Sequence, residues 1–164
     1  MLLGLVSDTH GYYHPALDDV FAGVDLILHA GDVGTADVLD RLERLAPVRG
    51  VYGNIDGAPV RGRLPEHARF EAGGLRVWMT HVGGRPGRWA AGVGPELGRE
   101  RPDLFVCGHS HVLQVERVRA LGGLLFVNPG AAGRHGFHRV KTCVRLRVEG
   151  GAAREAEVIH LDGD

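Results

Sequence analysis

The chain opens with Leu2-Leu3-Gly4-Leu5-Val6-Ser7-Asp8-Thr9-His10, in which a short apolar run passes directly into polar residues. Such a run is typical of a buried strand that ends in a loop. Asp25–His29 and Val48–Tyr52 repeat the pattern. The segments that begin at Pro15 and at Thr35 have apolar residues at helical spacing, and Thr35 is the expected N-cap of the second helix. Because strands that alternate with helices need crossover connections, we predict parallel pairing and an α/β core.

The second half of the chain is richer in strands. Gly73-Gly74, Gly122-Gly123 and Gly150-Gly151 predict hairpin turns. The segment from Arg88 to Glu100 is predicted to be largely helical. We expect the strands of this half to pair antiparallel in a second sheet that shares one core with the first, so that residues 1–164 form a single domain. The predicted strands are Arg69–Glu71, Leu75–Thr80, Leu104–Cys107, Val112–Val118, Leu124–Val127, Val140–Val148 and Ala153–Leu161.

Composition excludes several classes of protein. The formal net charge of -1 gives no footprint for general nucleic-acid or anionic-membrane binding. The apolar runs are far shorter than the ~20 residues that cross a bilayer, and the N-terminal stretch lacks the basic region of a signal peptide. The two cysteines, Cys107 and Cys143, are far apart and form no metal or disulfide pattern, so a reducing cytoplasm is the expected compartment.

Scarce polar residues follow the predicted strands. The chain holds two serines and two asparagines, and both serines and Asn54 lie in these positions. The carboxyl ends of strands border the ligand crevice of open α/β sheets, so we expect the polar groups to meet at one edge. The stretches are Ser7-Asp8-Thr9-His10, His29-Ala30-Gly31-Asp32, Gly53-Asn54-Ile55-Asp56, His81 and Gly108-His109-Ser110-His111.

The spacing within these stretches suits metal binding. Residues i and i+2 of an extended segment point the same way, so Asp8 and His10 can hold one ion, and His109 with His111 can serve one or two. A glycine before Asp32, Asn54 and His109 permits close backbone approach. Carboxylate, amide and imidazole ligands favour Mn, Fe, Zn, Ni or Co over a cysteine-zinc site or an all-oxygen Mg site.

Each motif alone has an ordinary explanation. Asp-x-His is usually a loop or a capped helix start, Gly-Asp and Gly-Asn are common turns, and His-x-His is as often a surface pair. Their ordered occurrence after successive strands distinguishes this chain from such accidents. The sequence therefore predicts a metal site at one sheet edge.

In these stretches, together with Asn128-Pro129-Gly130, the sequence resembles the calcineurin-like metallophosphoesterases, in particular their small bacterial and archaeal phosphodiesterase branch. The matching motifs span most of the chain in the family's order. The resemblance implies a four-layer α/β-β/α sandwich of two mixed sheets flanked by helices. It also implies a hydrolase that acts on a small phosphate ester, most often a diester, and a dimer or tetramer of identical chains.

The resemblance also implies two divalent metal ions, with Mn favoured. It assigns Asp8, His10 and His111 to one metal, with Asp32 bridging both. It assigns Asn54, His81 and His109 to the other metal, and it gives Asp32, Asn54, His81 and His109 catalytic roles. Two cations about 3.5–4 Å apart can hold a phosphoryl group and generate hydroxide, so the expected reaction is in-line attack of a metal-bound hydroxide on phosphorus.

The chain departs from the family pattern at three positions. Ile55 stands where many relatives have a histidine thought to assist the leaving group, so good leaving groups such as aryl esters should be favoured. Val82-Gly83 follows His81 where Gly-His is usual, which makes His81 the ligand with the weakest motif. Ala131 replaces the usual serine after Asn128-Pro129-Gly130.

The remaining histidines have ordinary explanations. His29 should support a ligand or pack in the core. His14, His135 and His138 are expected on loops near the edge of the site, where Arg134 could contact a phosphate but is more simply a solvated loop residue. His67 and His160 are assigned to surface or sheet positions, and Asn128 to shaping its turn.

Two other functions compete with a phosphodiesterase. One is a catalytically weak or silent scaffold that acts through protein contacts, as a retromer subunit of this fold does; that route predicts loss of metal ligands, which this sequence does not show. The other is a protein-phosphatase or dinucleotide-polyphosphate type of enzyme. Its Gly-Asp-x-x-Asp-Arg-Gly and Gly-Asn-His-Glu motifs are missing from the stretches at Gly31 and Gly53, so that class is disfavoured.

Overall fold

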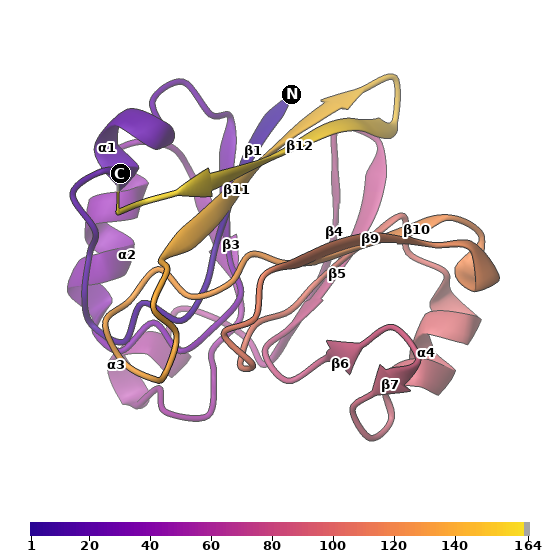
Figure 1. Ribbon diagram of the computed structural model, residues 1–164, viewed down its shortest axis with the longest axis horizontal. Coiled ribbons are helices and arrows are strands. Elements are labelled where there is room, and N and C mark those ends of the chain that lie inside the picture. The colour runs from indigo at the N-terminus through magenta and orange to yellow at the C-terminus, as the bar shows by residue number, and fades with distance from the viewer. Residues whose placement is uncertain (163–164) are drawn as a thin grey trace.

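In the computed structural model, which describes residues 1–162, two five-stranded sheets lie face to face with helices on both outer sides (Figure 1). The first sheet has the order β12-β11-β1-β2-β3 and the second β4-β5-β8-β10-β9. The expected α/β fold with two mixed sheets is confirmed. Among residues 1–162, no helix combines the length and the apolar character needed to span a bilayer.

The first sheet combines strands from the N-terminal and the C-terminal parts of the chain. Strands β1, β2 and β3 pair in parallel, and the β11–β12 hairpin adds to β1 antiparallel. Helices α1, α2 and α3 cover its outer face (Figure 1). The elements are β1 (Leu2–Val6), α1 (Leu17–Val20), β2 (Leu26–His29), α2 (Ala36–Glu43), β3 (Val48–Gly50), α3 (Ala58–Arg61), β11 (Thr142–Glu149) and β12 (Ala152–His160).

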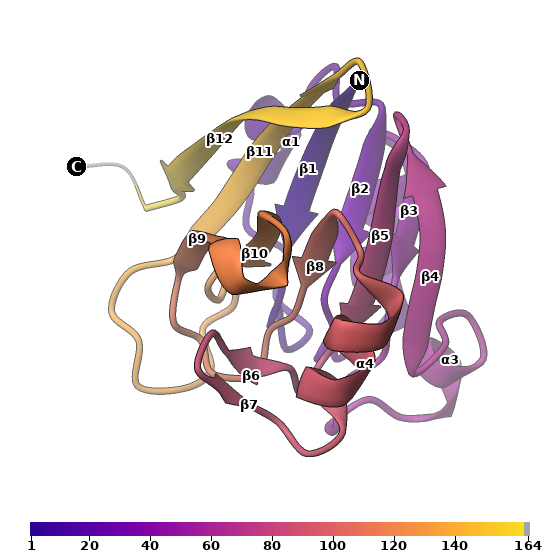
Figure 2. The same cartoon turned by 90° about the vertical axis from the view of Figure 1, so that its right-hand side faces the viewer.

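The second sheet is built from the middle of the chain. Its central strands β5, β8 and β10 are parallel, and β4 and β9 flank them antiparallel. Helix α4 lies against its outer face, as Figure 2 shows. The elements are β4 (His67–Ala72), β5 (Leu75–Thr80), β6 (Gly84–Arg85), β7 (Arg88–Trp89), α4 (Val93–Glu100), β8 (Leu104–Val106), β9 (Gln114–Val118), the 3-10 turn η1 (Arg119–Leu121) and β10 (Leu124–Asn128).

Three apolar clusters hold the four layers together. The largest lies between the sheets and includes Leu5, Leu28 and Val106. A second joins the first sheet to its helices, and a third packs Leu97 of α4 against Phe105. The strands β1, β2, β8 and β10 are therefore buried on both faces, which explains why they read as continuous apolar runs.

Two sequence expectations need correction. Arg88–Glu100 is helical only from Val93, because Arg88–Trp89 instead pairs with Gly84–Arg85 in a small hairpin. The second-half strands do not all pair antiparallel, and β11 and β12 return to the first sheet. Thr35 occupies the N-cap position of α2 as expected, without a capping hydrogen bond from its side chain.

Candidate metal centre

The loops after β1, β2, β3, β5 and β8 meet at one edge of the sandwich. They bring together the seven side chains that the sequence predicts as metal ligands. The backbone N–H of His109, after β8, donates to the Asp8 carboxylate after β1, and Nδ1 of His81, after β5, donates to the Ala30 carbonyl after β2, so the loops of the two sheets are tied to one another. The site is thus built at the junction of the two sheets.

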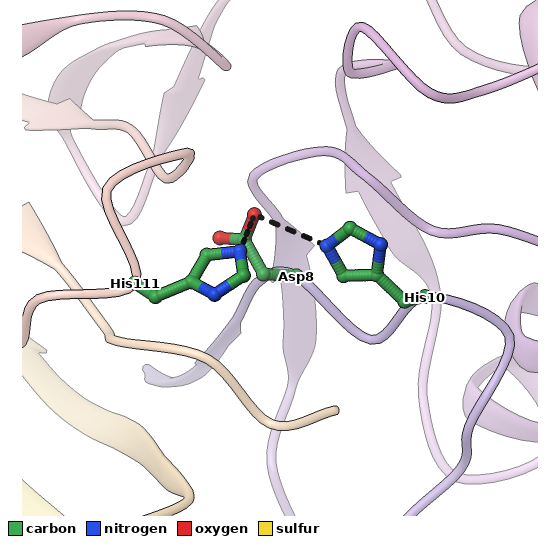
Figure 3. A group of neighbouring side chains, drawn as sticks. All are labelled: Asp8, His10 and His111. Atoms are coloured by element: carbon green, nitrogen blue, oxygen red, sulfur yellow. Dashed lines mark ion pairs between the residues drawn. The ribbon is translucent and has the colours of Figure 1, made fainter. Parts of the chain in front are cut away.

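Asp8, His10 and His111 form the first cluster, and Figure 3 shows their side chains turned toward one another. One ligand atom from each lies within 4.8 Å of the other two. The Asp8 Oδ1 atom is 3.2 Å from Nε2 of His111 and 3.9 Å from Nε2 of His10. These three residues are the set expected for one metal.

Asp32, His81 and His109 form a second cluster of the same kind. Asp32 Oδ2 lies 3.2 Å from Nε2 of His81. The amide oxygen of Asn54 lies 3.0 Å from Nδ1 of His109, which adds Asn54 to this group. The four side chains are those expected around the other metal.

Asp32 stands between the two clusters. Its Oδ2 atom faces His81 of the second cluster and lies 3.7 Å from Nε2 of His10 in the first. Its other oxygen, Oδ1, accepts a hydrogen bond from the backbone N–H of Ile55. The carboxylate is therefore anchored by one oxygen and presents the other to both groups.

Hydrogen bonds aim the ligand atoms of the first loop. The Oδ2 atom of Asp8 accepts from the Ser7 hydroxyl at 2.7 Å and from the His109 backbone at 3.1 Å, which leaves Oδ1 directed at the histidines. His81 donates from Nδ1 to the Ala30 carbonyl at 2.7 Å, so in the neutral imidazole Nε2 carries a lone pair toward Asp32. Such outer partners orient metal ligands.

His138 orients His111, a contact that the sequence did not reveal. Its Nε2 lies 2.9 Å from the Gly133 carbonyl and must donate to it, so its Nδ1 is free to accept. Nδ1 of His111 lies 3.2 Å from that atom and donates to it. In the neutral form of His111, Nε2 then carries the lone pair on the side of Asp8. The two histidines are 27 residues apart, and no local pattern links them.

The residues present fit metal ions. Among residues 1–162, the buried side-chain atoms that have no hydrogen-bond partner include Asp8 Oδ1, His10 Nε2 and His81 Nε2. Buried polar atoms are normally paired, and lone pairs that face one another at this range repel unless a proton or a metal cation lies between them. The carboxylate and imidazole donor set suits first-row divalent ions.

The backbone at these ligands is unusual. Among residues 1–162, six non-glycine residues have a positive φ: Asp8, His10, Asp32, Arg101, His109 and His111. Five of these six are predicted ligands. Left-handed backbone costs conformational free energy in L-residues and clusters at functional sites, where the position of a side chain outweighs the strain of the backbone.

Charges within the site oppose the effect of burial. Burial lowers the pKa of His81, but the carboxylates of Asp32 and Asp8 outweigh it and leave that pKa raised. The Asp8 carboxylate raises the pKa of His111 more than burial lowers it. Burial lowers the pKa of His10 more than Asp32 and Asp8 raise it. Burial raises the pKa of Asp32, but His81 and the Ile55 N–H bring it below its ordinary value.

Asp56 clamps the two loops that carry Asp32 and Asn54. Its buried carboxylate accepts hydrogen bonds from the backbone N–H groups of Val33, Gly34 and Gly53, at 3.1, 2.7 and 2.8 Å. The sequence placed Asp56 within a motif but assigned it no role. Its geometry makes it a positioning residue for both clusters.

The glycines before three ligands are required by close approach, as predicted. A Cβ on Gly31 would lie 2.5 Å from Nδ1 of His81, one on Gly53 would fall on the Asp32 carboxylate, and one on Gly108 would fall on the Ser7 hydroxyl. Any side chain at these positions would displace a ligand or its partner.

The other histidines occupy varied surroundings. His29 is fully buried, and burial lowers its pKa to about 4. His135 stacks on His10 with ring centroids 4.8 Å apart, whereas His14 pairs with Asp162. His67 and His160 lie exposed on strands β4 and β12.

Two predicted polar side chains make local contacts. Arg134 donates to the Tyr12 hydroxyl. The Asn128 amide donates to the Gly108 carbonyl and the Ser110 hydroxyl and accepts from Gly130, so it shapes its turn as expected.

Comparison with known proteins adds sequence and structural relatives. The calcineurin-like phosphoesterase superfamily domain matches residues 1–151. A probable metallophosphoesterase of Methanothermobacter thermautotrophicus is 36% identical over 139 residues, which cover 80% of this chain and 77% of the relative. One of Methanocaldococcus jannaschii is 34% identical over 140 residues, covering 80% and 68%.

Solved structures share the fold. A structure described as a novel archaeal phosphodiesterase has a TM-score of 0.79 at 22% identity and covers 98% of this chain and 99% of its own. Wild-type Vps29 of Entamoeba histolytica complexed with zinc has a TM-score of 0.73 at 21% identity, covering 99% and 100%.

Proposed function

The chain belongs to the calcineurin-like phosphoesterase superfamily, and from that membership we propose that it is a phosphodiesterase that works with two divalent metal ions. Family membership supports a hydrolase of phosphoesters. The substrate class that we propose is a small phosphate diester. The seven residues that we propose as metal ligands are Asp8, His10, Asp32, Asn54, His81, His109 and His111.

One observation carries the proposal: the free oxygen of Asp32 faces both residue clusters. Oδ2 is 3.7 Å from His10 and 3.2 Å from His81, while Oδ1 is held by the Ile55 backbone. A carboxylate in this position can contact two cations at once and offset part of their repulsion. We therefore assign Asp8, His10 and His111 to one ion and Asn54, His81 and His109 to the other.

Two divalent cations, when bound, polarise a phosphoryl group and lower the pKa of water near it. The mixed carboxylate, amide and imidazole ligands accept Mn, Fe, Ni, Co or Zn, and the family resemblance favours Mn among them. The chain itself supplies the fixed spacing. Ser7, Ala30, Ile55 and His138 each hold one ligand by a hydrogen bond, so the ligand atoms are arranged before any ion or substrate arrives.

Ile55 restricts the leaving group. Its side chain is 48% exposed at the mouth of the site, beside Asn54, and it cannot donate a proton. A leaving group that departs on this side must be stable as an anion. Aryl esters meet that condition, so we expect aryl diesters to be hydrolysed faster than alkyl diesters.

The decisive experiment combines metal analysis with a choice of esters. The protein is stripped of metal, reloaded separately with Mn, Fe, Co, Ni or Zn, and assayed on bis(p-nitrophenyl) phosphate and on p-nitrophenyl phosphate. We expect two bound ions per chain and a preference for the diester. A clear preference for the monoester would overturn the diesterase assignment.

The same experiment separates enzyme from scaffold. A chain that binds metal but hydrolyses neither ester would favour the alternative, a weak or silent member of this fold that acts through protein contacts. Failure to bind any of the ions would overturn the metal assignment as well. We favour the enzyme because all seven proposed ligand positions hold residues able to bind a metal.

A reducing cytoplasm remains the expected compartment, supported by Cys107 and Cys143, which are both buried free thiols. A homodimer or homotetramer remains the expected assembly, which light scattering can measure directly.

A further inference from the structure

A hollow of about 500 Å³ lies directly beside the candidate metal centre. It is bordered by the β6–β7 hairpin on one side and by the loop after β8 on the other. His109, Ser110 and Val112 line both this hollow and the mouth of the metal centre. A molecule whose phosphate lies at the metal ligands can therefore extend into it.

The hollow presents apolar and aromatic surface. Its aromatic surface comes from the partly exposed Trp89, whose ring packs on the buried rings of Phe126 and Phe105 with centroids 5.7 and 5.9 Å apart. Val82 and Val112 line it with 44% and 62% of their surface exposed. Apolar side chains that gather at a concave site gain free energy when a ligand covers them.

The charge of the hollow favours an anion. Arg85 and Arg88 of the small hairpin are exposed in its lining, which includes no acidic residue. Within residues 1–162, neither guanidinium makes an ion pair or a side-chain hydrogen bond. The neighbouring hollow on the other side of Val82 differs, because Glu66 lines it. A phosphodiester keeps one negative charge and is attracted to the first hollow more than to the second.

We propose that this hollow is a subsite for one ester substituent of the phosphodiester, and that the substituent is aromatic. The proposal rests on the function proposed above and names the substrate class more closely. A flat ring matches the apolar lining at Trp89, Val82 and Val112, and the anionic phosphate beside it matches Arg85 and Arg88. The hollow thus accounts for a second ester group, which a phosphomonoester lacks.

Binding of a pair of phosphonate monoesters tests the subsite without turnover. Methyl phenylphosphonate and methyl methylphosphonate carry the same charge and differ only by the ring. We expect the phenyl compound to bind the Mn-loaded protein about tenfold more tightly, as burial of one apolar group allows. Calorimetry gives both dissociation constants. Equal affinities would overturn the proposal.

Two matched valine substitutions locate the effect. Val82→Asn should reduce the preference for the phenyl compound to about one- to threefold, because it places a polar group in the lining. Val158→Asn, at an exposed valine of the edge strand β12, should leave the preference unchanged. A Val82→Asn protein that keeps the full preference would overturn the assignment to this hollow.

Trp89 provides a second readout. Of the two tryptophans, Trp78 is buried and Trp89 is partly exposed in the hollow. The phenyl compound should change tryptophan fluorescence in the wild type, and Trp89→Phe should abolish that change while keeping the preference. A fluorescence change that survives Trp89→Phe would place the ring elsewhere.

Failure of the subsite and failure of the enzyme are distinguishable. Hydrolysis of bis(p-nitrophenyl) phosphate without a phenyl preference in phosphonate binding would remove the subsite and leave the phosphodiesterase. A phenyl preference without hydrolysis of any ester would remove the phosphodiesterase and leave an aromatic-phosphonate binding site.

Discussion

The two ends of the sheets use left-handed backbone in opposite ways. At the end away from the metal centre, three hairpins turn on Gly73-Gly74, Gly122-Gly123 and Gly150-Gly151, and every one of these glycines has a positive φ. At the other end, five of the predicted ligands have a positive φ although they are aspartates and histidines. Glycine occupies the positions where the chain only turns, and aspartate or histidine occupies the positions whose side chains form the candidate metal centre.

The polar groups of the two ends differ as well. At the hairpin end, Arg76 forms a two-pronged ion pair with Asp103, and both are open to solvent. At the ligand end, Asp8, His10 and His81 each keep a buried atom without a hydrogen-bond partner. The polar groups at the hairpin end are thus paired within the protein, whereas the ligand end has buried polar atoms without a hydrogen-bond partner.

The largest effect expected from this contrast is on metal binding and on turnover. Asp32→Ala should remove bound metal and hydrolysis together, and the loss should exceed the roughly 10–100-fold that follows removal of an outer partner of a ligand. Asp103→Ala, the same substitution at the hairpin end, should change neither. Metal analysis and initial rates on bis(p-nitrophenyl) phosphate measure both. Retained activity in Asp32→Ala would contradict the bridging role.

The next largest effect is expected on stability. Asp56→Ala leaves three backbone N–H groups of the ligand loops without an acceptor, so the free energy of unfolding should fall by about 4 kcal/mol. Asp25→Ala removes a single, exposed acceptor from the Leu2 N–H at the other end of β1 and should cost less than about 1 kcal/mol.

Urea unfolding of the two metal-free variants measures this difference. Asp56→Ala should also weaken metal binding, because the loops that carry Asp32 and Asn54 lose their common anchor. Equal losses of stability in the two variants would show that Asp56 is not a clamp.

The meeting of the predicted ligand residues could be foreseen because the chain order of strands and loops places them at one edge. Asp8, Asp32 and His81 follow strands that are parallel within their sheets, and parallel strands end at the same side. The departure at Val82-Gly83 did not displace His81, because its position depends on the Ala30 carbonyl and on the space above Gly31.

Long-range contacts were not predictable from local pattern. The apolar residues of β11 do not indicate which sheet the strand joins. In the structure it pairs with β1 of the first sheet. The β6–β7 hairpin has two residues in each strand, too few for a period to emerge. The contacts of His138 with His111 and of Asp56 with Val33 join loops that only the fold brings together.

His29 predicts a pH dependence at the ligand end. Its Nδ1 accepts from the Gly31 N–H, and its Nε2 donates to the Thr9 hydroxyl, which donates onward to Val33. A proton on Nδ1 would face the Gly31 N–H, and burial lowers the pKa of His29 to about 4. The unfolded chain therefore binds a proton between about pH 6.5 and 4 that the folded chain does not.

The contribution of His29 to the free energy of unfolding should accordingly fall by about 3 kcal/mol as the pH falls through that window. His29→Asn retains an acceptor for the Gly31 N–H but cannot be protonated. The difference in stability between wild type and His29→Asn, from urea unfolding of the metal-free proteins, should shrink or reverse from pH 7 to pH 4. A difference that does not change with pH would contradict the neutral, buried imidazole.

The smallest effect expected is the cost of the left-handed backbone itself. Gly122→Ala, where an added Cβ meets no atom within 4 Å, should lower the free energy of unfolding by about 1 kcal/mol through the backbone alone. At the ligand end, His111→Ala and His111→Gly both remove the imidazole, so their difference isolates the backbone at φ 59. His111→Gly should be more stable by about 1 kcal/mol in the metal-free protein. The two His111 variants could instead unfold at the same urea concentration while Gly122→Ala is destabilised. That result would show that the left-handed backbone at His111 costs no free energy. The two ends would then differ only in their unpaired polar atoms.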